Sequence, residues 1–78
     1  MQSNSVMVLV LNNTLYVNLG KIIKRGNLII HDASGKTIFK EQIEETNYEV
    51  IKLDQPQGKY WITIDSENDL TKKTFHLK

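Results

Sequence analysis

The sequence contains two imidazole side chains, those of His31 and His76, and no cysteine. A zinc ion takes three or four ligands, and two histidines without a metal-ligand spacing do not supply such a set. The lack of cysteine also removes disulfides, thiolate metal sites and thiol nucleophiles. We therefore predict no metal site and no cofactor, and we interpret both histidines as strand residues near an outer face.

Three acidic side chains, Asp65, Glu67 and Asp69, alternate within one polar segment. Hard cations such as calcium favour this density of oxygen ligands. A calcium loop of the EF-hand type, however, needs glycine at its sixth position, where Leu70 stands, and glutamate at its twelfth. We interpret the segment as the solvated tip of a hairpin.

Sequence signatures of catalysis are missing. The chain has no G-x-S-x-G nucleophile elbow, no G-x-x-x-x-G-K phosphate loop and no G-x-G-x-x-G fingerprint. A chain of 78 residues buries roughly 60% of the surface that its unfolded form exposes, so little remains for a deep pocket. We predict that the protein is not an enzyme and has no catalytic residues.

The single tryptophan, Trp61, is the strongest candidate for a contact with a partner. Because side chains alternate along a strand, it points away from the face that holds Tyr60. Thr63 shares its outer face, and so does His76 if the last two strands pair. An exposed indole flanked by hydrogen-bonding groups can stack on a glycan or anchor another protein. The alternative is that the second sheet or the first strand covers Trp61, which then packs in the core.

Net charge and the length of the apolar segments exclude two classes of partner, nucleic acids and the interior of a membrane. Ten Lys and Arg against nine Asp and Glu give a net charge of +1, without the concentrated basic surface of a nucleic-acid binder. No segment approaches the roughly 20 apolar residues that span a bilayer. We expect no nucleic-acid partner and no membrane insertion.

The elements that must hold these residues are strands. No window has the spacing of an amphipathic helix, and β-branched and aromatic residues alternate with polar ones. Short turns at regular intervals are typical of an all-β fold, and we predict a single immunoglobulin-like β-sandwich over residues 1–78. Its seven or so antiparallel strands are Ser5–Leu11, Thr14–Leu19, Gly26–Asp32, Thr37–Ile43, Tyr48–Leu53, Gly58–Asp65 and Thr71–Leu77.

Turn residues and alternation give finer expectations. Asn12 and Asn13 suit a two-residue hairpin turn, and Gly35 is expected to adopt positive φ. Lys21–Arg25 is interpreted as a basic crossover between strands. The first strand is apolar on both faces, which predicts a central or covered position. The core is expected from one face of each later strand: Leu15, Val17, Leu19, Leu28, Ile30, Ile51, Leu53, Tyr60, Ile62, Ile64, Phe75 and Leu77.

Two segments resemble small secreted Bacteroidetes β-sandwiches. Leu28–Lys36 resembles their x-I-x-D-x-x-G-x strand and turn, and Leu53–Tyr60 resembles their L-x-x-P-x-G-x-Y corner. In that corner we expect the Tyr60 hydroxyl to bond to backbone between Asp54 and Gly58. Two families share this pattern: immunoglobulin-like proteins of unknown function, and C-terminal sorting domains of type IX secretion cargo, which tend to end in a Lys-rich strand like Lys72–Lys78.

The sequence departs from the sorting-domain pattern, because the usual Asn-Pro pair is missing near Asn12. The resemblance therefore favours a non-catalytic secreted or periplasmic module with a structural or binding role. A sorting domain is the alternative. Either family implies a periplasmic or extracellular location, with the natural signal peptide not included in this sequence. The expected partner is another protein or a glycan.

Overall fold

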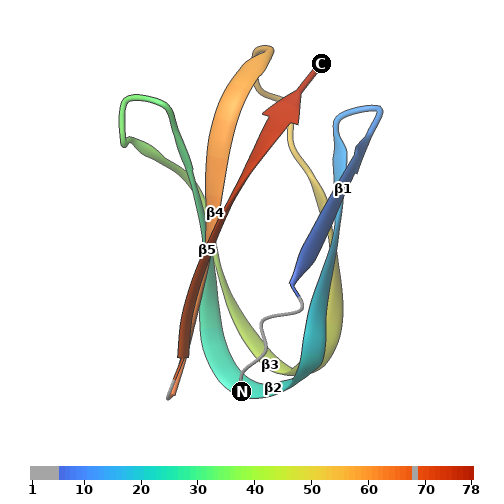
Figure 1. The fold of residues 1–78 in the computed structure, drawn as a ribbon, viewed down its shortest axis with the longest axis vertical. Coiled ribbons are helices and arrows are strands. Elements are labelled where there is room, and N and C mark those ends of the chain that lie inside the picture. The colour runs from blue at the N-terminus through green and yellow to red at the C-terminus, as the bar shows by residue number, and fades with distance from the viewer. Residues whose placement is uncertain (1–5, 68) are drawn as a thin grey trace.

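The computed structural model describes residues 6–67 and 69–78, and this part of the chain contains strands and no helix (Figure 1). The all-β class is therefore confirmed. All pairings are antiparallel. The five strands are β1 (Met7–Leu11), β2 (Thr14–Asp32), β3 (Thr37–Lys52), β4 (Gly58–Ser66) and β5 (Asp69–Leu77).

The prediction of seven strands is wrong in number, because two strands are longer than predicted. β2 joins the second and third predicted strands, and β3 joins the fourth and fifth. The segment Lys21–Arg25 is consequently part of β2 and not a crossover. Both strands bend without ending: Gly20 has a φ of 80° and Glu45 a φ of 51°, and the β2–β3 register shifts between Asn18 and Ile23.

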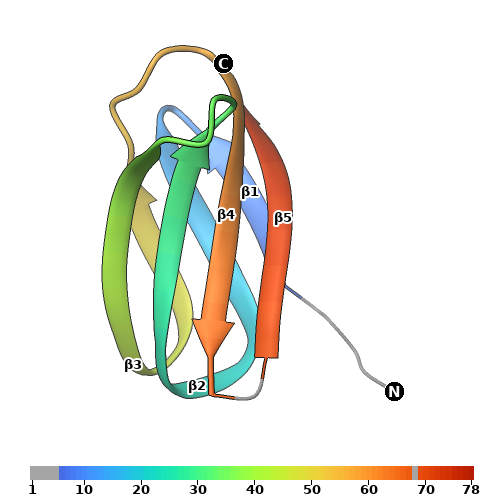
Figure 2. The same cartoon turned by 90° about the vertical axis from the view of Figure 1, so that its left-hand side faces the viewer.

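These bends curl one hydrogen-bonded sheet into two layers, which we call the first sheet and the second sheet. In the first sheet the early half of β2 lies between β1 and the late half of β3, so that Leu15 stands opposite Val10 and Ile51. In the second sheet the late half of β2 lies between β4 and the early half of β3, and β5 follows β4. Figure 2 shows β3, β2, β4 and β5 side by side, with β1 behind them.

The core fills the space between the layers. Every side chain that alternation predicted to face inward is buried. Leu15, Val17, Leu28, Ile30 and Ile62 are the largest that are fully enclosed. Three further apolar side chains that alternation did not place in the core are also buried: Val6, Ile23 and Ile43.

The turns follow the predicted chemistry. Asn12 and Asn13 both have positive φ, 51° and 64°, which is the conformation of a type I′ hairpin turn. Gly35 has a φ of 94°, and its N–H donates to the carbonyl of Asp32 at 3.0 Å. The Tyr60 hydroxyl donates to the carbonyl of Pro56 at 2.6 Å, which confirms the expected corner.

The expected position of the first strand is wrong. β1 pairs only with β2 among the described residues and therefore lies at the edge of the first sheet. Val8 and Val10 pack against the core, whereas Met7, Leu9 and Leu11 are 68%, 63% and 56% exposed. Two apolar faces predict a covered strand, and in this structure one of those faces is open.

Candidate functional site

Trp61 lies on the outer face of the second sheet and is half-buried. Its register partners are His31 on β2 and Thr74 on β5. The neighbouring residues Tyr60 and Ile62 point into the core. Trp61 therefore occupies the predicted face and is not in the space between the sheets.

The indole contacts two side chains of its own molecule. The rings of His31 and Trp61 stack with centroids 5.9 Å apart and planes inclined by 18°. The Lys59 ammonium lies 5.3 Å from the centroid of the Trp61 ring, within the range of a cation–π interaction. His31 was not predicted as a partner of Trp61, because only the antiparallel β2–β4 register brings the two rings together.

The other two predicted contact residues share this outer face. Thr63 is half-buried two positions along β4, and His76 is exposed opposite Lys59 on β5. The structure thus brings Trp61, Thr63 and His76 onto one surface. Their contact with a partner stays a prediction.

A second surface was not predicted: the apolar outer face of the first sheet. Leu9, Tyr16 and Val50 stand side by side across β1, β2 and β3, and Met7 and Tyr48 flank Asn18 in the next row. Val50 is 56% exposed, and Tyr48 is also exposed. The alternation of side chains would have predicted this apolar face if β1 had been recognised as an edge strand. We call these residues the outer apolar face.

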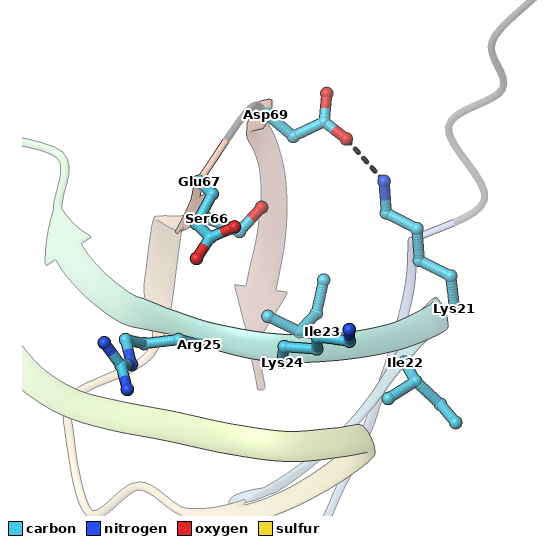
Figure 3. A pocket seen from close by; sticks show the side chains of 8 residues that line it. All are labelled: Lys21, Ile22, Ile23, Lys24, Arg25, Ser66, Glu67 and Asp69. Carbon is cyan, nitrogen blue, oxygen red and sulfur yellow. Dashed lines mark hydrogen bonds and ion pairs between the residues drawn. The ribbon is translucent and has the colours of Figure 1, made fainter.

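A groove of about 230 Å³ opens where β2 bends past the β4–β5 turn (Figure 3). The Lys21 ammonium and a carboxylate oxygen of Asp69 form an ion pair of 2.5 Å across its opening. Both side chains are more than half exposed, and exposed pairs add little to stability. The lining residues are Lys21, Ile22, Ile23, Lys24, Arg25, Ser66, Glu67 and Asp69.

Two of the three carboxylates considered for calcium, Glu67 and Asp69, line this groove, and Asp65 does not. Ser66 and Asp69 pair at the end of the β4–β5 hairpin, as expected for a hairpin tip, and Asn68 lies outside the described residues. Within residues 6–67 and 69–78, no three His, Asp or Glu side chains are grouped as a metal ion would require. The Asp69 carboxylate is instead paired with Lys21.

The carboxylate of Asp32 organises the turn between β2 and β3. It accepts hydrogen bonds from the Ser34 hydroxyl at 2.6 Å, from the Ser34 N–H at 2.9 Å and from the Lys36 N–H at 3.0 Å. These bonds, led by that of the Ser34 hydroxyl, lower the pKa of Asp32 below its ordinary 3.8. The arrangement is structural, since each donor belongs to the turn itself.

Comparison with known families gives a match over residues 11–78, to the family described as the secretion system C-terminal sorting domain. The chain belongs to this family. The matched range contains all of β2, β3, β4 and β5. A search of curated proteins finds no match. No helix in the described part of this sorting domain is long and apolar enough to cross a membrane.

Family membership corrects the balance between the two functional expectations. The alternative, a sorting domain, is better supported than a stand-alone structural or binding module. The missing Asn-Pro pair near Asn12 pointed the other way, but the match extends from the adjacent Leu11 to the end of the chain. A domain of this family is part of a secreted or cell-surface protein.

Proposed function

We propose that this chain is a non-catalytic export signal that the type IX secretion machinery recognises as a folded domain joined to a cargo protein. The observation that carries the proposal is the match of the sorting-domain family to residues 11–78. That range contains four of the five strands and most of the core, which supports recognition of a fold over recognition of a short linear motif.

The packing supports recognition of the folded state. The buried core draws side chains from four strands: Leu28 and Ile30 come from β2, Ile43 and Ile51 from β3, Ile62 from β4 and Phe75 from β5. None of these strands can bury its apolar face alone, so the surface that a receptor meets exists only when all of them have assembled.

The partner in this proposal is a protein of the secretion machinery. The surface around Trp61, Thr63 and His76 is the first contact to test, because a half-buried indole beside hydrogen-bonding groups can anchor a protein. A glycan is the second candidate, since stacking on the same indole would hold a sugar ring.

The proposal is tested by fusing residues 1–78 to the C-terminus of a fluorescent reporter that carries a signal peptide. The fusion is expressed in a bacterium with a type IX system, and the reporter is measured in the periplasm, on the cell surface and in the medium. We expect export to the surface or the medium. A reporter that stays in the periplasm, with the domain intact, would contradict the proposal.

A matched pair of variants separates the fold from the mere presence of the sequence. Ile30 is fully buried in β2, and Ile22 is 65% exposed in the same strand. Ile30→Asp places an unpaired charge in the core and should unfold the domain and abolish export, whereas Ile22→Asp should do neither. Equal export of the two fusions would show that the folded state is not what is recognised.

A further inference from the structure

Within residues 6–67 and 69–78, three strands of the curled sheet have an edge that pairs with no other strand, and two of these strands carry a charge that faces inward. Glu49 on β3 stands opposite the buried Val17, and Lys73 on β5 stands opposite the buried Ile62. Directly opposite residues share a face, so both charges lie on the core side of an edge strand. Such charges prevent another strand from pairing there.

β1 lacks this protection. Its sequence, Met-Val-Leu-Val-Leu, contains no charge, proline or glycine. Its inner side chains pack on the core, and its outer side chains are exposed. An uncharged apolar edge strand is the kind that pairs with a further strand.

We propose that the free edge of β1 pairs with β1 of a second copy of this chain. The two strands run antiparallel about a two-fold axis at Leu9, so that Leu9 faces Leu9, Met7 faces Leu11 and Val8 faces Val10. The first sheets of the two copies then form one continuous sheet, and the outer apolar face continues across the junction. The contact is self-complementary, as a two-fold interface requires.

The chemistry of the edge favours a second copy over other occupants. An incoming strand must be apolar on both faces, because its outer side chains lie beside Met7, Leu9 and Leu11 and its inner ones beside Val8 and Val10. β1 itself meets this requirement at every position. Pairing β1 with itself also places no like charges opposite one another, and the net charge of +1 per copy gives little repulsion.

Sedimentation equilibrium of the 78-residue chain tests the pairing. One strand pair is a small interface, so we expect weak dimers, with the mass rising from 9.0 kDa towards twice that value between about 10 µM and 1 mM. Leu9→Lys should weaken the dimer about tenfold or more, because it opposes two like charges. Val50→Lys, on the same outer face but on β3, should leave the dimer unchanged while showing the same melting temperature as Leu9→Lys.

Single cysteines identify the edge directly, since residues 1–78 contain none. Under mild oxidation Leu9→Cys should form a disulfide-linked dimer, because the two side chains meet at the axis. Val50→Cys, similarly exposed on the other edge strand of the first sheet, should form no disulfide-linked dimer. A chain that stays monomeric at 1 mM, or equal cross-linking of the two variants, would overturn the proposal, as would a dimer that Leu9→Lys does not weaken.

Discussion

Tyr60 connects the corner before β4 to the core through both ends of its side chain. Its ring is buried and stacks with that of Phe75, with centroids 5.8 Å apart, and its hydroxyl donates to the Pro56 carbonyl. The sequence predicted both the burial and the hydrogen bond, because the glycine corner and the alternation along β4 are local signals.

Truncation of this residue separates the two contributions. Tyr60→Phe removes only the hydroxyl and should lower the free energy of unfolding by about 1 kcal/mol. Tyr60→Ala also removes the ring and should cost about 3–5 kcal/mol. Urea denaturation followed by far-UV circular dichroism measures both. Equal losses for the two variants would show that the ring contributes nothing.

Asp32 gives the domain a stability that depends on pH. The hydrogen bonds from Ser34 and Lys36 lower the pKa of Asp32 in the folded state, so the charged form stabilises the fold. That stability is complete above the ordinary pKa of 3.8 and is lost as the pH falls through the lowered value. Thermal melts of the natural chain and of Asp32→Asn should differ most near neutral pH and converge in acid. A difference that stays constant with pH would contradict this assignment.

Trp61 should tolerate truncation better than its neighbour. It is half-buried on an outer face, so Trp61→Ala should lower the free energy of unfolding by about 1 kcal/mol through the lost contacts with His31 and Lys59. Calorimetry against Tyr60→Ala makes the comparison. If Trp61→Ala stays folded but its reporter fusion is exported less well than the fusion with the unchanged domain, Trp61 contacts the partner. Strong destabilisation of Trp61→Ala would instead show that Trp61 supports the core.

Among the elements, the sequence predicted the faces of the strands better than their ends. Alternation depends on neighbouring residues, so the prediction of which side chains of β2, β4 and β5 face the core was correct. The bends in β2 and β3 could not be predicted, because strand continuity there depends on pairing between distant segments. The exposure of β1 was missed for the same reason: its two apolar faces are visible in the sequence, but its place at an edge depends on the topology.

The bend of β3 contains a residue in an unfavourable conformation. Glu45 has a φ of 51°, a region in which a residue with a Cβ atom is strained and glycine is not. Glu45→Gly should therefore raise the free energy of unfolding by about 0.5–1 kcal/mol, after the entropy cost of glycine is subtracted. Glu44→Gly, one position earlier and without positive φ, should lower it by a similar amount. Thermal melts of both variants provide the test, and a shift of the same sign in both would contradict the strain.

At the scale of the whole molecule, β5 completes the second sheet. Phe75 and Leu77 are buried, and β5 pairs with β4 along its whole length. Removing residues 69–78 should leave the chain unfolded, because the small core of a chain of this length loses the buried side chains of Phe75 and Leu77. Removing only Lys78, which is exposed, should change nothing. Dispersed amide signals in the NMR spectrum of the longer truncation would contradict this.

Because β2 and β3 both run through the two layers, the layers share a backbone. The two layers cannot separate unless β2 and β3 both straighten at their bends or both lose their inter-strand hydrogen bonds there. Local openings should therefore be confined to the hairpin tips, and amide protons on the two sides of the bends should exchange with solvent at one common rate set by global unfolding. In hydrogen-exchange terms, the sandwich has two layers and a single cooperative unit.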